Sequence, residues 1–195
     1  MNKTDLRKYI RSIRTKMSRE EAEVKSRAIF DRLKELGHRF FGSSVFIYVS
    51  FDNEADTNPI IEYFLSNDLI VSVPVVVPDV RIDAVRIGSP HCNMKKGCLG
   101  IYEPEEGDVI ACKDISSAII PGIAFDRNLN RIGFGKGYYD DFLVKTNARK
   151  IALAYDFQIV ESIGADEWDV PMDVIITDKE IIYPKGKKEE VHNRL

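Results

Sequence analysis

Residues 121–143, PGIAFDRNLNRIGFGKGYYDDFL, connect an apolar strand end to a helix through a polar turn and a glycine-rich loop. The apolar residues before Pro121 indicate the strand, and the spacing of the aromatic residues after Gly137 indicates the helix. Glycines let a ligand approach the backbone closely, and free N–H groups at the start of a helix attract negative charge. A strand, a glycine loop and a helix start in this order therefore predict an anion-binding site.

Charged side chains in this loop suit a phosphorylated ligand. Arg131 and Lys136 are cations able to hold phosphate oxygens, and Asp140 is an oxygen ligand of the kind that a Mg²⁺–nucleotide complex recruits. The residue pattern alone leaves a second interpretation open, because most glycine-rich turns serve backbone geometry and bind nothing.

The loop matches neither of two common nucleotide-binding motifs. A Walker A loop requires Ser or Thr where Gly137 stands, and the dinucleotide motif requires a glycine where Tyr138 stands. The longer pattern Pro-Gly-x-Ala-Phe-Asp, followed by Arg-x-Gly-x-Gly-Lys-Gly-Tyr-Tyr-Asp, resembles the 5-formyltetrahydrofolate cyclo-ligase family. The resemblance extends from Lys3 to about Tyr183.

Apolar runs that alternate with helical patterns predict an α/β fold with a mainly parallel sheet covered by helices on both faces. Helices are predicted over residues 3–17 and 18–36, with a third that starts near Thr57. Pro74 is expected to interrupt one strand, and residues 160–163 are expected to form a short helix or turn. The remaining patterns predict strands over residues 45–49, 69–77, 81–87, 150–155 and 174–177.

The resemblance implies a single three-layer domain over residues 1–183, related to the sugar-phosphate isomerase and CoA-transferase folds. Residues 184–195 are charged and are expected to form a mobile tail. The implied reaction is the ATP-dependent conversion of 5-formyltetrahydrofolate to 5,10-methenyltetrahydrofolate with release of ADP and phosphate. The formyl oxygen would be phosphorylated first, after which N10 attacks and closes the ring.

The resemblance also implies roles for individual residues. The implied ATP contacts are Lys3, Arg7, Arg131, Gly133, Gly135, Lys136, Gly137, Tyr138 and Tyr139. The implied folate contacts are Val49, Glu54, Phe134, Gly135, Lys136, Gly137 and Tyr138. The catalytic role falls to Lys136, Arg131 and Tyr138, and Mg²⁺ falls to Asp140 and Asp173.

Several of these residues also have plainer interpretations. The cations of residues 3–14 could form a solvated helix face, and Glu54 could be a solvated loop acid. Tyr138 could pack in the core, and Asp173 could cap an element end. The chain also departs from the family pattern at Phe134 and Asp141, where arginine is common, which affects contacts to the glutamate chain of the substrate.

Composition limits the function classes. The chain has 195 residues, 44% of them hydrophobic, which suits one globular domain, and its formal net charge of −3 gives no case for a nucleic-acid partner. No apolar run approaches a membrane span, and an odd count of three cysteines suggests reduced thiols. We therefore expect a cytoplasmic monomer, with no membrane partner, that acts on small molecules. The rival readings are a non-catalytic folate- or nucleotide-binding regulator and an isomerase of the same fold.

Overall fold

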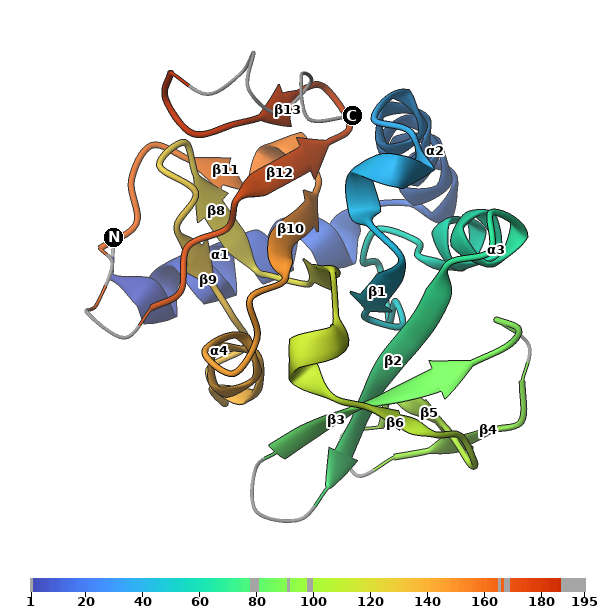
Figure 1. Cartoon of the computed structure of the whole chain (residues 1–195). Coiled ribbons are helices and arrows are strands. Elements are labelled where there is room, and N and C mark those ends of the chain that lie inside the picture. Colours follow the sequence, from blue (N-terminus) through green and yellow to red (C-terminus); the bar gives the residue numbers. More distant parts are fainter. Residues whose placement is uncertain are drawn as a thin grey trace.

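The computed structural model describes residues 2–77, 81–90, 92–97, 100–164, 166 and 169–186 (Figure 1). Its main sheet has eight strands in the order β13-β12-β10-β7-β1-β2-β3-β6. The parallel strands are β12 (Val174–Thr177), β10 (Arg149–Ala154), β7 (Ser117–Ile120), β1 (Ser44–Ile47) and β2 (Ile70–Val77). Antiparallel strands complete the edges, namely β13 (Ile181–Ile182), β3 (Arg81–Ile87) and β6 (Val109–Ile110). The predicted mainly parallel α/β sheet is confirmed.

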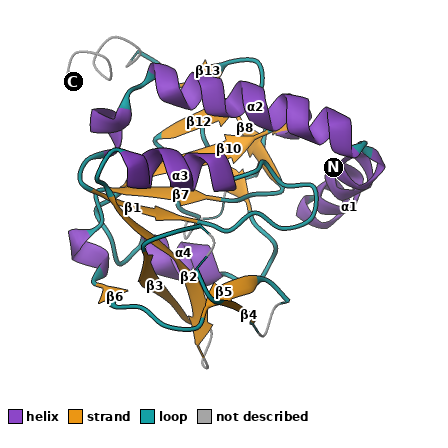
Figure 2. Cartoon of the chain, turned by 90° about the vertical axis from the view of Figure 1, so that its right-hand side faces the viewer, coloured by secondary structure: helices purple, strands orange, loops and turns teal. Residues whose placement is uncertain are grey.

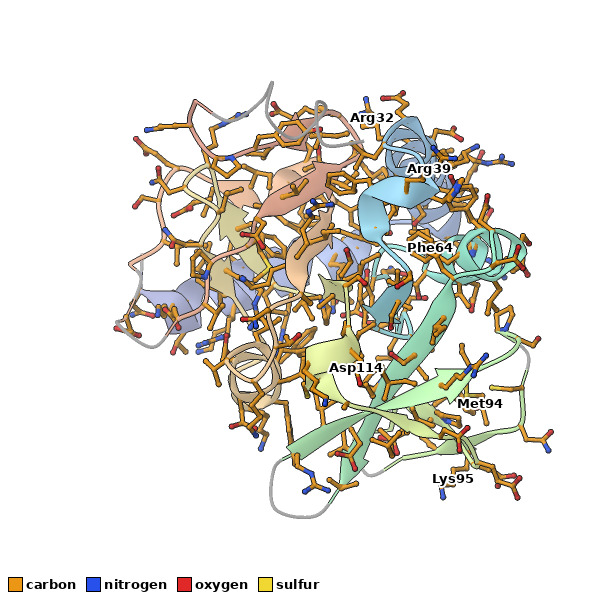
Figure 3. All side chains as sticks on the ribbon, viewed as in Figure 1. Arg32, Arg39, Phe64, Met94, Lys95 and Asp114 are labelled. Atoms are coloured by element: carbon orange, nitrogen blue, oxygen red, sulfur yellow. The ribbon has the colours of Figure 1, made fainter. Side chains whose placement is uncertain are left out.

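The central strands are apolar along their whole length because both faces of the sheet are covered. Every residue of β1, β7 and β12 is buried. On one face lie α2 (Arg19–Glu35) and α3 (Asn58–Ser66), which Figure 2 shows side by side. Leu33 of α2 and Phe64 of α3 join Ile47 of the sheet in one core cluster. Phe64 therefore lies inside this layer, whereas Lys95 lies at the exposed rim (Figure 3).

The second face is covered by a short helix and a second, smaller sheet. Helix α4 (Tyr138–Leu143) stacks Phe142 on Phe46 of β1, with ring centroids 4.3 Å apart. Helix α1 (Lys3–Lys16) packs on the small sheet rather than on the main one, and its Leu6 and Ile10 share a cluster with Ile132 (Figure 1). The small sheet has the order β11-β8-β9, formed by Ile159–Val160, Ala124–Asp126 and Arg131–Ile132. Helices thus cover the second face only in part.

Two local predictions are wrong. Pro74 does not interrupt β2, where it pairs with Ala84 of β3. The pairing of β2 with β1 ends at Ser72, so β1 requires no N–H from Pro74. Val160 lies in strand β11 rather than in a helix or turn, because it pairs with Asp126 of β8.

The helix starts follow the sequence with one change. The Ser18 side chain accepts a hydrogen bond from the Glu21 N–H and so caps the start of α2. Thr57 stands at the start of α3, but its hydroxyl accepts from the Ser50 N–H instead and so ties the loop after β1 together. In the predicted tail, residues 187–195 lie outside the described residues.

The remaining elements are short. They are η1 (His38–Phe41), β4 (Met94–Lys96), β5 (Tyr102–Pro104), η2 (Cys112–Asp114) and η3 (Asp156–Gln158). In the part of the chain that is described, no helix is long and apolar enough to cross a bilayer.

Strand order places a crevice in the middle of the main sheet. The chain passes from β1 to β2 on one side, and then continues from β7 to β10 and β12 on the other side of β1. The order therefore reverses between β1 and β7, which are parallel and adjacent. In open α/β sheets, ligands bind outside the carboxyl ends of the strands at such a reversal.

Candidate functional site

A cavity of about 500 Å³ lies beyond the ends of β1 and β7. Most of its wall comes from one face of α1, residues 48–54 after β1 and the segment from Pro121 to Asp140 after β7, and Pro74, Ile101 and Asp169 complete it. The volume lies in the range of small-molecule sites, which is about 300–1,000 Å³. The sequence-predicted glycine loop and Glu54 thus meet at one cavity.

The glycine loop presents Lys136 between two residues of unusual backbone. Gly135 has φ 93° and Gly137 has φ 74°, both in the left-handed region that side chains rarely adopt. These turns leave Lys136 exposed at the cavity, and among the described residues its ammonium group has no hydrogen-bond or ion-pair partner. Lys136 is therefore a cation free to meet an anionic ligand.

Arg131, by contrast, is already paired. Its side chain is only 2% exposed, and Nη2 donates to Asp140 Oδ1 at 2.5 Å while Nη1 donates to the Pro121 carbonyl. Its Nε is buried and has no hydrogen-bond partner in the part of the chain that the structure describes. Arg131 therefore joins the end of β7, strand β9 and helix α4 at the floor of the glycine loop.

Helix α1 lines the cavity with four cations on one face. Their spacing of four, four and three residues places Lys3, Arg7, Arg11 and Arg14 along a single stripe. Lys3 Nζ contacts Asp166 Oδ2 at 2.6 Å and Asp169 Oδ2 at 2.7 Å. Partial burial works against its charge, but these two hydrogen bonds raise the pKa of Lys3.

The other members of the stripe contact the glycine loop. Arg7 Nε donates to the Gly133 carbonyl at 2.9 Å. The guanidinium carbons of Arg11 and Arg14 lie 5.7 and 5.9 Å from the ring centroid of Phe134. Sequence reasoning assigned Arg11 and Arg14 to a solvated face and missed their place in the cavity. The signal that could have found them is their common stripe with Lys3 and Arg7.

Glu54 is a carboxylate held almost out of solvent. Its side chain is 10% exposed, Oε2 accepts from the Phe51 N–H at 3.1 Å, and Oε1 lies 3.6 Å from Arg14 Nη1. Burial raises the pKa of Glu54 to about 7, against the opposing effect of the nearby Arg14 charge. The interpretation of Glu54 as a solvated loop acid is therefore wrong.

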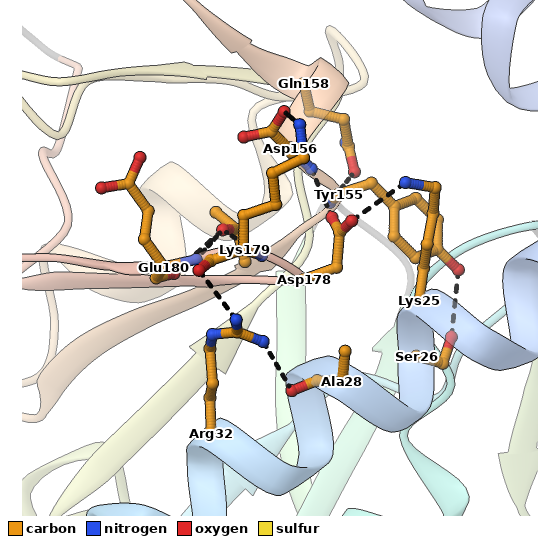
Figure 4. A network of polar contacts seen from close by, with 11 residues as sticks. Lys25, Ser26, Ala28, Arg32, Tyr155, Asp156, Gln158, Asp178, Lys179 and Glu180 are labelled. Atoms are coloured by element: carbon orange, nitrogen blue, oxygen red, sulfur yellow. Dashed lines mark hydrogen bonds and ion pairs between the residues drawn. The ribbon is translucent and has the colours of Figure 1, made fainter.

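A hydrogen-bond network supports the backbone of Glu54 from behind. The Tyr155 hydroxyl donates to the Glu54 carbonyl at 3.0 Å and lies 3.1 Å from Ser26 Oγ. Figure 4 shows this network continuing through the ion pair of Lys25 with Asp178, whose atoms lie 2.9 Å apart. Asp178 also accepts from the Asp156 N–H. The loop after β1 thus rests on α2, on Tyr155 directly after β10, and on the β12–β13 hairpin.

Comparison with known proteins places this site in a family. A model described as the 5-formyltetrahydrofolate cyclo-ligase family matches residues 1–178. The chain belongs to this family. The 5-formyltetrahydrofolate cyclo-ligase of Escherichia coli K12 is 28% identical over 178 residues, which cover 88% of this chain and 98% of the relative.

Solved cyclo-ligase structures share the fold. The 5,10-methenyltetrahydrofolate synthetase of Aquifex aeolicus has a TM-score of 0.84 and 34% identity, covering 95% of this chain and 94% of its own. The corresponding synthetase of Mycoplasma pneumoniae has a TM-score of 0.75 and 28% identity, covering 91% and 99%.

In this cyclo-ligase family member, all the residues predicted as ATP or folate contacts line the cavity. Tyr138 and Tyr139 both line the cavity and also pack, half-buried, against the core. The ring of Tyr139 packs on Phe46, and burial raises its pKa. Phe134 is 38% exposed at the cavity, whereas Asp141 pairs with Lys145 outside the lining.

The two predicted metal ligands do not share one place. Asp140 lines the cavity, but Asp173 is outside the lining, where its Oδ2 accepts from the Lys150 N–H at 2.8 Å. Asp169, which sequence reasoning left without a role, lines the cavity beside Lys3. Within the described ranges no group of three or more His, Cys, Asp or Glu side chains could by itself hold a metal ion. Glu167 and Trp168 of the same segment lie outside the described residues.

Proposed function

We propose that this chain is an ATP-dependent 5-formyltetrahydrofolate cyclo-ligase that forms 5,10-methenyltetrahydrofolate and releases ADP and phosphate. The observation that carries the proposal is that Lys136 and Glu54 line the same cavity. Lys136 lies on the glycine loop and has no partner among the described residues, whereas the Glu54 side chain is 10% exposed. A phosphate donor and a folate can therefore meet there. Membership of the cyclo-ligase family supports the same reaction.

The reaction has to remove a poor leaving group. The formyl carbon on N5 is an amide carbon, and its oxygen does not leave at neutral pH. Transfer of the γ-phosphoryl group to that oxygen forms a P–O bond and releases ADP. N10 then attacks the formyl carbon, the C–O bond breaks, inorganic phosphate departs, and the N10 proton passes to solvent. Positioning and charge neutralisation are what such a reaction asks of the protein.

The phosphate side of the cavity is assigned to the cations and the glycine loop. Lys136, without a partner of its own, would follow the moving γ-phosphoryl group, and Lys3 and Arg7 would hold the rest of the triphosphate. Arg131 would act through its fixed position beneath the loop, where Asp140 already holds it. The nucleotide contacts would be completed by Gly133, Gly135, Gly137, Tyr138 and Tyr139.

The folate side is assigned to the loop after β1. The Glu54 carboxylate accepts hydrogen bonds only, which suits the N–H edge of a pterin ring. Val49 lines the same wall. Phe134 presents an exposed ring at the cavity and could pack on the substrate, as could the backbone of residues 135–138.

The carboxylates fit a Mg²⁺ ion that enters with the nucleotide. Asp140 and Asp169 line the same cavity as the cations, and Mg²⁺ in nucleotide sites is commonly held by one or two carboxylates, phosphate oxygens and water. Mg²⁺ bound there would neutralise phosphate charge and orient the triphosphate. The position of Asp173 outside the lining favours Asp169 as the second ligand.

Absorbance at the methenyl-folate band tests the function directly. The protein is mixed with 5-formyltetrahydrofolate, ATP and Mg²⁺, and each component is omitted in turn. We expect a rise that requires all of them together with the protein. A folded protein that binds the folate but gives no rise would instead be a folate-binding regulator. A rise without ATP would contradict the phosphorylation step.

A further inference from the structure

Arg14 is the cation that faces Glu54 among the described residues. The other groups that face this carboxylate are Asp52 of its own loop, Tyr48 directly after β1 and Tyr139 of α4, and none of them carries positive charge. Tyr155 supports the Glu54 carbonyl rather than its side chain. The charge on the carboxylate therefore depends on one residue of another element.

Arg14 is itself fixed in place. It is 7% exposed, which is rare for an arginine on a helix face. Asn53 Nδ2 donates to the Arg14 carbonyl at 3.0 Å and to the Met17 carbonyl at 3.1 Å, so the residue before Glu54 is fastened to the end of α1. The Phe134 ring lies against the guanidinium group. Helix and loop therefore hold the two charges at a constant separation.

The separation leaves the carboxylate open. At 3.6 Å, Arg14 Nη1 is close enough to stabilise the charge on Glu54 Oε1 but too far for a good hydrogen bond. Oε2 is occupied by the Phe51 N–H, so Oε1 keeps lone pairs that point to no protein donor among the described residues. A ligand that presents N–H groups can use them.

We propose that Arg14 is a positioning residue for folate recognition, which favours the carboxylate form of Glu54 and leaves that carboxylate open to the cavity. This inference rests on the proposed function, since it takes the Glu54 carboxylate as the folate contact. Without the Arg14 charge, burial favours the neutral carboxyl group. The hydroxyl of a neutral carboxyl group is a hydrogen-bond donor, and it would face the N–H donors of the pterin edge. Folate affinity therefore falls.

The test compares Arg14→Met, which keeps length and removes charge, with Arg14→Lys, which keeps the charge. Kinetics with 5-formyltetrahydrofolate are measured from pH 6.5 to 9.5, and circular dichroism confirms folding. In Arg14→Met we expect the folate KM near pH 7 to rise about fivefold, because a one-unit increase from a pKa of about 7 lowers the ionised fraction of Glu54 from about a half to about a tenth. The rise should shrink towards pH 9. Arg14→Lys should recover most of it, and the KM for ATP should stay within about twofold.

Arg11→Met is the matched control, because Arg11 lies on the same helix stripe and against the same Phe134 ring but has no carboxylate partner in the described part of the chain. It should leave the pH profile of the folate KM unmoved. Two results would overturn the inference: a loss in Arg14→Met that is equal at every pH, or Arg14→Lys that is no better than Arg14→Met.

Failure of the proposed function would look different. Wild-type protein would then give no methenyl product, whereas failure of this inference leaves the wild type active and the variant profile unchanged. Carbon NMR of the Glu54 side chain provides a readout that needs no substrate. Its titration should move to higher pH in Arg14→Met but not in Arg11→Met, and an unmoved titration would refute the role of Arg14 whether or not the enzyme is active.

Discussion

Lys136 differs from the other cations of the cavity because its ammonium group has no hydrogen bond, ion pair or aromatic ring contact among the described residues. Its neighbours Arg131 and Lys3 hold carboxylates, and Arg7 holds a backbone carbonyl. The difference matters for catalysis, because a cation that is already paired must give up a contact before it can neutralise new charge on a phosphoryl group. An unpaired cation loses only its water.

Replacement of Lys136 by alanine should therefore reduce kcat by about 10²–10³ or more, the usual effect of removing one group that stabilises transition-state charge. Folate affinity should change little, since the folate side depends on Glu54. Lys145→Ala is the control, because Lys145 is also half-exposed but pairs with Asp141 outside the cavity. Near-normal turnover in the Lys136 variant would show that another group meets the γ-phosphoryl.

The two candidate metal ligands can be separated in the same assay. Asp169→Asn should raise the Mg²⁺ concentration for half-maximal activity by about tenfold or more, since hydrogen bonds and contacts of charged groups are worth about 1.5–3 kcal/mol. Asp173→Asn should leave that concentration near the wild-type value, because Asp173 lies outside the lining of the cavity. The reverse result would favour the assignment that the family resemblance implied.

Individual residues show where prediction from sequence succeeded and where it stopped. The loop from Gly133 to Asp140 could be predicted because its motif is long and local. Arg14 could not be separated from Lys8, which shares its chemistry and its helix, because only the folded chain decides that Arg14 faces Glu54. Asp169 and Asp173 differ in the same way, since both stand in one acidic segment and only one lines the cavity.

At the scale of elements, Gly122 controls how strand β7 turns into the β8–β9 hairpin. A Cβ at this position would lie 2.3 Å from Cζ of the fully buried Phe125. Gly122→Ala should lower the free energy of unfolding by about 1–3 kcal/mol, the usual cost of overpacking. Gly88→Ala is the control, as a Cβ there meets nothing within 4 Å. Urea denaturation measures both, and an equally stable Gly122 variant would mean that Phe125 can move aside.

Strands with continuous apolar runs were predictable, and β12 was predicted with the bounds that it has in the structure. The small sheet was not. Its strands β9 and β11 have two residues each, which is too short for any periodicity, and each is defined by its pairing with β8. Such pairs depend on tertiary neighbours rather than on local propensity.

For the whole molecule, the buried Glu54 makes stability depend on pH. Its pKa rises from an ordinary 4.5 to about 7 on folding, so the native state binds the proton more tightly than the unfolded chain. The stabilising contribution is therefore complete below pH 4.5 and is lost as the pH rises through 7, a change of about 3 kcal/mol at most.

The predicted kinship with the sugar-phosphate isomerase and CoA-transferase folds stays a prediction.

Urea denaturation of wild type and Glu54→Gln at pH 5 and pH 8, without ligands, measures this effect. Glutamine cannot ionise, so we expect the wild type to lose stability relative to the variant between the two pH values. An equal difference at both would show that Glu54 titrates at its ordinary pH.

Lys3 and its partner Asp166 are 163 positions apart in the sequence, yet their side chains touch. A ribosome synthesises the chain from its N-terminus, so α1 emerges long before the acidic segment that neutralises its first cation. Until that segment appears, the nascent chain carries a basic helix without its acidic counterpart. A premature stop before Asp166 would therefore release a fragment whose basic helix lacks these carboxylates and is open to nonspecific binding of cellular polyanions. The cell would then have to clear a fragment that binds other molecules, rather than a folded enzyme of low activity.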